Sequence, residues 1–195
     1  MQQFVVGYGS LISVESRKKS NLSEAAVPMS LEGYGRGWYV QARNNRTYLG
    51  VLPSPGKSIN GVLFSITSKE LEELDKREGA YDRVEVNNAS IKAEHFSPTD
   101  TAWIYLPKKD QVKFSPSPHF PVSRRYVDDT IAGCLDYGEE YAARFIKSTS
   151  LWLQYWRNNR IRSNEIAQKI DQLVGEYYPE SMKVEITRQS SNTKL

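Results

Sequence analysis

The chain has 195 residues, a length at which one domain buries a hydrophobic core without a structural metal or disulfide. Hydrophobic residues make up 39% of it, charged residues 25% and aromatic residues 11%, which excludes a disordered or collagen-like protein. The net charge of +3 is small beside the concentrated basic excess of most nucleic-acid-binding domains. We therefore expect a globular protein and no nucleic-acid partner.

The sequence carries none of the usual marks of secretion or membrane insertion. Its single cysteine, Cys134, cannot form an internal disulfide, and no Cys/His cluster has the spacing of a zinc site. Residues 1–7 lack the basic segment and long apolar run of a signal peptide. No stretch approaches the roughly 18 apolar residues of a membrane span. We expect a cytoplasmic protein with no membrane segment and no bound metal.

Short apolar stretches bounded by glycine or proline predict β-strands in the first 106 residues. The first, Phe4–Val6, runs into the glycine-containing turn Gly7–Ser10. Further strands are predicted at 38–42, 61–66, 83–86 and 101–106, with a loop at 52–56. This part of the chain is expected to form a small sheet or barrel.

One short helix interrupts the predicted strands. Thr67 and Glu70 have the spacing of a capping box, in which each side chain bonds the backbone N–H of the other. Leu71 and Leu74 give the helix an apolar side, and Gly79 is predicted to end it.

After a proline-rich stretch at 115–121 the chain is predicted to be mainly helical. One helix follows Ser123, and the next carries an apolar face of Tyr141, Phe145, Trp152 and Trp156. A last helix begins at the cap Ser163, with Ile166, Ile170, Leu173 and Tyr177 on one side. The tail at 188–195 is expected to fray. Strands followed by helices are typical of an α+β fold, here a sheet with helices packed on it.

The residues at the end of the first predicted strand do not match the common catalytic motifs. Residues 7–9 (Gly-Tyr-Gly) begin like a dinucleotide fingerprint, but Ile12 stands where the third glycine is required. Ser10 is not in a nucleophile elbow, which needs glycine at positions 8 and 12. His95 and His119 stand alone near prolines and are expected in loops. Nucleophilic triad chemistry is therefore not expected.

The turn Tyr8–Leu11 has two interpretations. Consecutive amide groups in a glycine-containing turn form a concave nest for an anion or a polarised carbonyl oxygen, and Ser10 adds a hydroxyl. Alternatively, the turn only ends a strand and Tyr8 packs in the core.

Glu78 also has two interpretations. It lies at the C-terminal end of the predicted short helix, where the negative end of the helix dipole disfavours an ionised carboxylate. Partial burial there would raise its pKa further, as suits a general base. Alternatively, Glu78 is a solvated surface residue beside Lys76 and Arg77.

Four short motifs follow one another along residues 4–138. In chain order they are Tyr8-Gly9-Ser10-Leu11 after a buried strand, Gly33-Tyr34-Gly35-Arg36, Leu74-Asp75-Lys76-Arg77-Glu78-Gly79 followed by Tyr81, and Pro121-Val122-Ser123-Arg124-Arg125-Tyr126 with Gly133 and Gly138 downstream. Together they resemble the γ-glutamylcyclotransferase superfamily, in particular its ChaC-type and mammalian-type γ-glutamyl cyclotransferases.

The resemblance implies a small mixed β-barrel with flanking helices and a cavity at its mouth, formed by residues 1–138. Residues 139–195 lie beyond it and are expected to form a mainly helical extension packed on that domain. The resemblance further implies an enzyme without a cofactor that releases 5-oxoproline from a small γ-glutamyl substrate. The substrate would be a γ-glutamyl amino acid, a γ-glutamylamine or glutathione, and the oligomeric state is not predicted.

The resemblance also implies a role for each site residue. Glu78 is the base that takes a proton from the α-amine of the substrate. The turn Tyr8–Leu11 holds the γ-glutamyl group with its backbone amides. Tyr126 matches a tyrosine that contacts the substrate; alternatively, it is a helix residue that packs on the barrel.

Two departures from the family's sequence pattern leave the identity of the substrate open. The tryptophan that follows the turn in ChaC-type members is absent, since Ser13 follows Ile12, and Tyr81 comes only three residues after Glu78. A binding protein that keeps the pocket without the activity is the alternative function. The basic stretch at 156–162 would contact a nucleic acid or another protein, or it is a solvated helix end.

Overall fold

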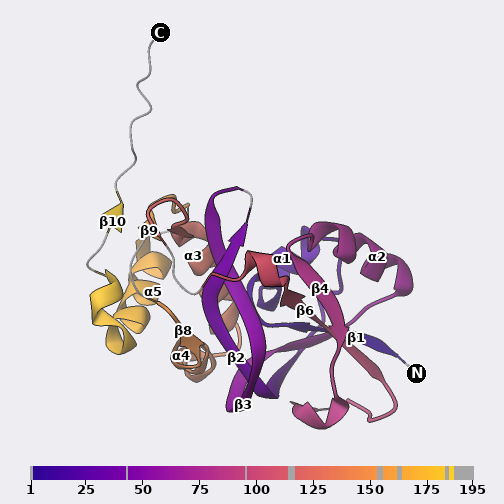
Figure 1. Ribbon diagram of the computed structural model, residues 1–195. Coiled ribbons are helices and arrows are strands. Elements are labelled where there is room, and N and C mark those ends of the chain that lie inside the picture. The colour runs from indigo at the N-terminus through magenta and orange to yellow at the C-terminus, as the bar shows by residue number, and fades with distance from the viewer. Residues whose placement is uncertain are drawn as a thin grey trace.

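A long hairpin of two strands, β2 (Val27–Ala42) and β3 (Arg46–Ser65), runs through the middle of the molecule (Figure 1). The computed structural model describes residues 2–42, 44–94, 96–113, 117–152, 156–161, 164–182 and 185–186. The strands predicted at 38–42 and 61–66 lie within this hairpin, apart from Ile66. Both are longer than predicted because β2 and β3 pair with each other along their length.

The loop predicted at 52–56 is wrong, because these residues continue β3. Pro53 pairs with Tyr34 of β2, and within the described residues no other strand pairs with this stretch. A strand tolerates proline at such an edge, where a missing N–H breaks no ladder bond. Gly56 has a φ of +81°, which glycine adopts without steric cost.

The described residues contain ten strands in one mixed sheet. Besides the hairpin it contains β1 (Gln3–Gly7), β4 (Tyr81–Glu85), β5 (Ile91–Ala93), β6 (Thr101–Pro107), β7 (Val122–Ser123), β8 (Thr149–Ser150), β9 (Trp156–Arg157) and β10 (Glu185–Ile186). β1 lies between β3, to which it is antiparallel, and β6, to which it is parallel. β4 pairs with β6, and β5 pairs with β2.

These strands confirm the α+β fold and the predictions at 4–6, 83–86 and 101–106, although Val86 lies just beyond β4. The pairings of the described residues do not close the sheet into a barrel, so the barrel stays a prediction. The division of the chain into a domain of residues 1–138 and an extension of residues 139–195 also stays a prediction.

The described residues contain five α-helices: α1 (Val14–Lys18), α2 (Ser68–Arg77), α3 (Arg124–Leu135), α4 (Glu139–Lys147) and α5 (Asn164–Tyr177), of which α5 packs on α3 and α4. They also contain four short 3-10 helices: η1 (Ser10–Ile12), η2 (Asn88–Ser90), η3 (Lys109–Gln111) and η4 (Pro179–Met182). The capping box of α2 and the Ser123 cap of α3 are confirmed. α2 ends one residue earlier than predicted, with Glu78 as its C-cap.

The prediction that one helix carries Tyr141, Phe145, Trp152 and Trp156 is wrong. α4 ends at Lys147, after which Thr149 pairs with β2 and Leu151 turns the chain with a φ of +61°. The two tryptophans follow this turn and still pack together, with ring centroids 6.4 Å apart.

The apolar side of α5 differs from the prediction at one position. Ile166 is 39% exposed, and Ala167 is buried in its place, beside Ile170 and Leu173. The predicted cap Ser163 and the tail at 188–195 lie outside the described residues.

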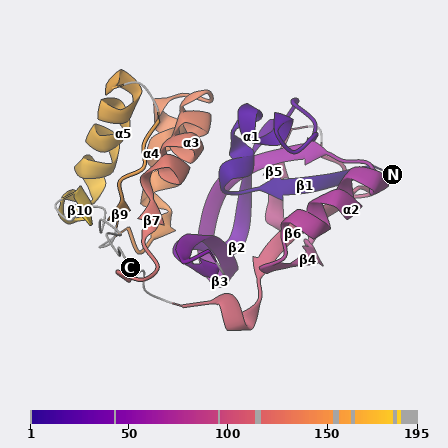
Figure 2. The same cartoon turned by 90° about the horizontal axis from the view of Figure 1, so that it is seen from above.

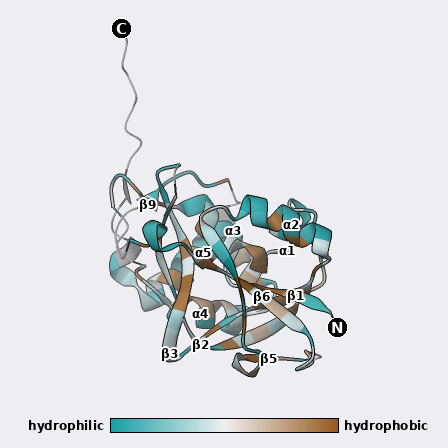
Figure 3. Ribbon diagram, turned by 45° about the vertical axis from the view of Figure 1, so that its right-hand side comes forward, coloured by the Kyte–Doolittle hydropathy of each residue, from teal (hydrophilic) through white to brown (hydrophobic). Residues whose placement is uncertain are grey.

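Two hydrophobic clusters pack on the sheet. The larger joins the strands to the helices through residues such as Trp38, Phe145 and Trp152, and the smaller lies among the strands. Figure 2 shows α3, α4 and α5 on one side of the hairpin, with β1, β4 and β6 on the other. Hydrophobic stretches run along β1, β3 and β6 (Figure 3). No helix in the described ranges has the length and apolar character needed to cross a membrane.

Candidate active site

A small cavity of about 50 Å³ lies where the end of β1 meets β3, the end of α2 and the start of α3. Its lining residues are Val6, Tyr8, Gly9, Ser10, Leu11, Leu49, Glu78, Tyr81, Tyr105 and Tyr126. The structure therefore brings together every residue that the sequence singled out for the site. The roles assigned to these residues stay predictions.

The turn that follows β1 directs its carbonyl oxygens into the protein. The Gly9 oxygen accepts a hydrogen bond from the N–H of Ile12 at 3.0 Å. The buried guanidinium of Arg17 donates to the carbonyl oxygens of Leu11 and Ile12 at 2.7 and 2.8 Å. In a trans peptide the N–H points opposite to the carbonyl, so Arg17 also orients the N–H groups of Ile12 and Ser13, which donate to the carbonyl oxygens of Gly9 and Ser10.

A second buried arginine, Arg36 of β2, holds the carbonyl at the start of the turn. It donates to the Tyr8 oxygen at 3.1 Å and to the carbonyl oxygens of Asn60 and Phe145 at 2.7 and 3.0 Å. Burial lowers the pKa of Arg36 to about 10, so the guanidinium stays charged at neutral pH. Arg36 belongs to one of the four sequence motifs, but its role was missed because it depends on contacts between distant segments.

Gly9 lies against the tyrosine that α3 brings to the turn. A Cβ atom at Gly9 would lie 3.0 Å from the Tyr126 hydroxyl, closer than most real Cβ contacts. The backbone and the hydroxyl of Ser10 both hydrogen-bond to the Tyr126 hydroxyl. Glycine at this position therefore allows the turn to approach the tyrosine closely.

Tyr126 both packs and reaches the cavity, so the two interpretations of it are compatible. Its ring stands edge-on to the rings of Trp38 and Tyr48, with centroids 5.8 and 5.2 Å apart. Its backbone N–H donates to the Ser123 hydroxyl that caps α3. The cap thus positions the first turn of α3, from which the Tyr126 hydroxyl enters the cavity.

Glu78 lies at the C-cap of α2, where its N–H donates to the Leu74 oxygen at 2.9 Å. Its side chain is only 18% exposed, so it is not a solvated surface glutamate. Burial raises the pKa of the Glu78 carboxyl, and the Arg77 guanidinium opposes this shift, with Nε 3.5 Å from Oε1. The result is a carboxylate that binds a proton more readily than usual, as a general base requires.

Two further tyrosines line the cavity and were not predicted as site residues. The Tyr81 hydroxyl donates to the Leu49 oxygen at 2.8 Å, and the Tyr8 hydroxyl donates to the Tyr105 oxygen at 2.6 Å. Burial raises the pKa of Tyr8 and Tyr81 well above the ordinary value of 10.0 and that of Tyr126 to about 12. All of these phenols are neutral at pH 7. The sequence signal for Tyr81 was its place in a motif, whereas Tyr105 had only its place in an apolar strand.

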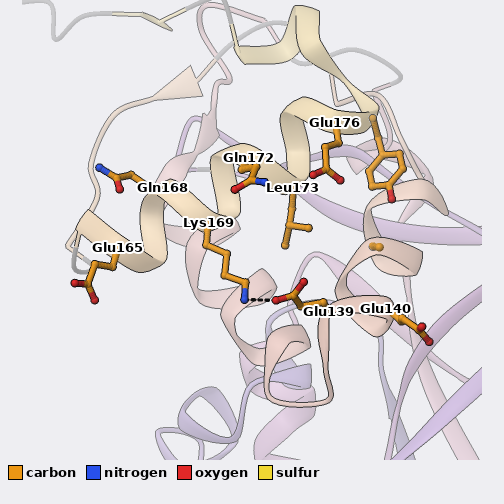
Figure 4. Close-up of a pocket in the computed structure, with 10 residues that line it drawn as sticks. Glu139, Glu140, Glu165, Gln168, Lys169, Gln172, Leu173 and Glu176 are labelled. Carbon is orange, nitrogen blue, oxygen red and sulfur yellow. Dashed lines mark hydrogen bonds and ion pairs between the residues drawn. The ribbon is translucent and has the colours of Figure 1, made fainter.

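Other predicted features lie away from the cavity. In the basic stretch at 156–162, Arg160 is engaged by the carboxylates of Asp128 and Asp171, at 2.9 and 2.6 Å. His119 lies exposed in a turn, and His95 is outside the described residues. A larger hollow of about 610 Å³ between α4 and α5 shares no residue with the cavity (Figure 4).

Comparison with known proteins gives a family and a fold. Residues 5–123 match the family model described as gamma-glutamyl cyclotransferase, AIG2-like, a range that includes Glu78 and the turn Tyr8–Leu11. Tyr126 lies three residues beyond that range. A search of curated proteins finds no match.

Three solved structures share the fold. One titled "Gamma-glutamyl cyclotransferase" has a TM-score of 0.61 and 18% identity over 88% of this chain and 99% of its own. An uncharacterised protein from Homo sapiens has a TM-score of 0.59 and 19% identity over 86% of this chain and 97% of its own. YkqA from Bacillus subtilis has a TM-score of 0.53 and 17% identity over 89% of this chain and 54% of its own. Because the family match spans more than half of the chain, the protein belongs to the gamma-glutamyl cyclotransferase, AIG2-like family.

Proposed function

We propose that the protein is a γ-glutamyl cyclotransferase that releases 5-oxoproline from a γ-glutamyl compound. One observation carries this proposal: the Glu78 carboxylate, with its raised pKa, lines the same cavity as the turn Tyr8–Leu11. A base and a row of backbone amides are what the reaction needs on the two sides of the reacting carbonyl.

The reaction is an internal acyl transfer. Glu78 takes a proton from the substrate's α-amine, whose nitrogen then attacks the γ-carbonyl carbon and closes a five-membered ring. The carbon–nitrogen bond to the leaving amine breaks, and Glu78 returns the proton to the leaving nitrogen. No oxidation state changes and no water is consumed, so the proposal assigns no cofactor or metal.

The turn Tyr8–Leu11 stabilises the negative charge that develops on the γ-carbonyl oxygen. The Tyr8 carbonyl is held by Arg36, which fixes the direction of the Gly9 N–H in the same peptide, so this amide needs no reorganisation when the charge appears. Removing one donor of this kind typically raises a barrier by about 2.7–4 kcal/mol. The buried guanidinium groups of Arg17 and Arg36 add a positive potential behind the turn.

Tyr126 positions the substrate in this proposal. Its neutral hydroxyl donates to a carboxylate or carbonyl oxygen of the γ-glutamyl group, while the phenol oxygen accepts from the N–H and the hydroxyl of Ser10. The internal attack has no bimolecular entropy cost, so holding the chain of the substrate in a folded conformation is the main task of the pocket.

The test is to measure 5-oxoproline release from a panel of γ-glutamyl dipeptides, γ-glutamyl-ε-lysine and glutathione. We expect release from at least one class by the wild type and none by Glu78→Gln. Glu72→Gln, on the exposed side of α2, is the matched control and keeps full activity. Binding of a γ-glutamyl compound without release by the folded wild type would instead support the binding protein.

A further inference from the structure

One carboxylate of α2, that of Asp75, contacts two neighbouring strands of the sheet. The Tyr105 hydroxyl of β6 donates a hydrogen bond to Asp75 Oδ1 at 2.7 Å. The Arg83 guanidinium of β4 forms an ion pair with the other oxygen, with Nη1 3.1 Å from Oδ2. Asp75 therefore connects the helix that ends beside Glu78 with both strands, and α2 lies along them in Figure 2.

Arg83 and Tyr105 are direct partners in the sheet. They face each other across the antiparallel β4–β6 ladder, so their side chains leave the same face. The Arg83 guanidinium also lies over the Trp103 ring, 4.8 Å from its centroid. The Arg83–Asp75 ion pair is partly exposed, with 31% and 39% of the two side chains accessible, and such pairs stabilise a protein little. Its main effect is to orient the Asp75 carboxylate, whose other oxygen meets Tyr105.

Tyr105 belongs to the wall of the candidate active site. It lines the small cavity together with Glu78, and only 5% of it is exposed. Its backbone oxygen accepts the hydrogen bond of the Tyr8 hydroxyl. Tyr105 thus contacts both sides of the site, Tyr8 through its backbone oxygen and α2 through its hydroxyl.

The apolar contacts of α2 leave the rotation of the helix weakly defined. Leu71 and Leu74 are buried, but hydrophobic contact has no preferred direction. Asp75 lies three residues before Glu78, and residues at this spacing are neighbours on one side of a helix. The hydrogen bond from Tyr105 to Asp75 therefore fixes the side of α2 from which Glu78 reaches the cavity.

We propose that Asp75 is a positioning residue that holds Glu78 at the cavity through its hydrogen bond with Tyr105. The inference rests on the proposed function and deepens it, because it names the contact that places the base. Asp75 touches no substrate in this proposal and exchanges no proton with it.

The test breaks the same hydrogen bond from each end, with Asp75→Ala and Tyr105→Phe. We expect each variant to lower kcat for 5-oxoproline release by about tenfold, because a misplaced base reacts more slowly. KM should change by less than about twofold in Asp75→Ala, since Asp75 does not contact the substrate. The double variant should lose no more than the larger single loss, because both changes remove one interaction.

The pH dependence separates a positioning effect from a loss of stability. A displaced Glu78 carboxylate is more exposed to water, so its pKa falls toward 4.5 and the acid limb of kcat/KM moves to lower pH. Loss of the Asp75 charge would act in the same direction. Tyr105→Phe keeps that charge, so the same shift in Tyr105→Phe assigns it to the position of Glu78.

Two further variants serve as controls. Asp75→Asn keeps an acceptor for the Tyr105 hydroxyl and should retain at least about a third of the wild-type kcat. Glu72→Ala removes an exposed carboxylate from the same helix and should leave kcat and the pH profile unchanged.

Wild-type kcat and an unshifted acid limb in folded Asp75→Ala and Tyr105→Phe would overturn the positioning role alone. Equal losses in Asp75→Asn and Asp75→Ala would overturn it as well. Tyr105→Phe decides the question if Asp75→Ala does not fold. Absence of 5-oxoproline from every substrate of the panel with the wild type would overturn the proposed function and this inference with it.

Discussion

The burial of Glu78 favours its proposed role as a base and lowers the stability of the folded protein. Its carboxyl lies at the end of α2 with 18% of the side chain exposed, and burial raises its pKa above the ordinary value of 4.5. The same desolvation that makes it a better base disfavours the charged form in the folded protein. A carboxylate in such a position is therefore expected to destabilise the fold at neutral pH.

Replacing this residue should make the protein more stable. The folded state binds the Glu78 proton more tightly than the unfolded state, so stability falls as the pH rises through the window from 4.5 to the raised pKa. Glu78→Gln removes this loss. We expect a higher Tm than wild type at pH 7 and no difference below 4.5, where both states are protonated, as measured by thermal unfolding across pH. A Tm at pH 7 equal to or below that of the wild type would contradict the assigned burial effect.

The residues of the site differ in how well the sequence predicts them. Tyr8–Leu11, Glu78 and Tyr126 stand in short motifs, so their types and spacing are visible in the chain. Arg17 and Arg36 act through the carbonyl oxygens of other segments, and such contacts exist only in the folded protein.

At the scale of elements, α2 positions Glu78 because its start is fixed locally. The Thr67 N–H donates to Glu70 Oε2 at 2.8 Å, and the Glu70 N–H donates to the Thr67 hydroxyl at 3.3 Å. Leu71 and Leu74 then bury the inner side of the helix. A capping box depends on four consecutive residues alone, which explains why the sequence predicts this helix correctly.

Thr67→Ala tests this element. Loss of an N-cap hydroxyl typically costs about 1 kcal/mol, and we expect a decrease of that size in the free energy of unfolding measured with urea. The kcat/KM should stay unchanged, because the native helix still ends at Glu78. Lys69→Ala, which leaves the cap intact, should change stability by less than about 0.5 kcal/mol. A cost for Thr67→Ala no larger than that of the control would show that the cap does not stabilise α2.

The elements that the sequence mispredicts depend on distant partners. Residues 52–56 look like a loop because they contain two prolines and a glycine, yet pairing with β2 keeps them in a strand. Likewise, the aromatic spacing from Tyr141 to Trp156 suggests one helix. The chain leaves that helix because Thr149 pairs with β2 and Leu151 takes a left-handed conformation. The secondary-structure propensity of a short stretch carries no information about the distant strand that pairs with it.

At the scale of the whole molecule, the site is assembled by contacts between the sheet and the C-terminal helices. A Cβ atom at Gly133 of α3 would lie 2.6 Å from the Ser13 Cα atom, so the helix packs directly on the segment after η1. Arg36 connects the end of β1 with β3 and with the end of α4. Helices far along the chain thus fix the turn that lines the cavity.

Arg36→Met tests this assembly. The variant keeps an apolar stem but removes the Arg36 donor from the buried carbonyl oxygens of Tyr8 and Asn60, whereas the Phe145 oxygen keeps the Thr149 hydroxyl. Each unsatisfied buried group costs about 1–3 kcal/mol, so we expect the free energy of unfolding in urea to fall by more than about 2 kcal/mol. Arg125→Met, which removes an exposed ion pair with Asp129, should cost less than about 1 kcal/mol. Equal costs for the two variants would contradict a central role for Arg36.

The most direct test of the central claim is to measure 5-oxoproline release and γ-glutamyl substrate binding on the same samples of the wild type and Glu78→Gln. The account predicts release by the wild type, and in the variant retained binding with turnover reduced at least about 100-fold. Normal turnover by folded Glu78→Gln would contradict the assignment of Glu78 as the base.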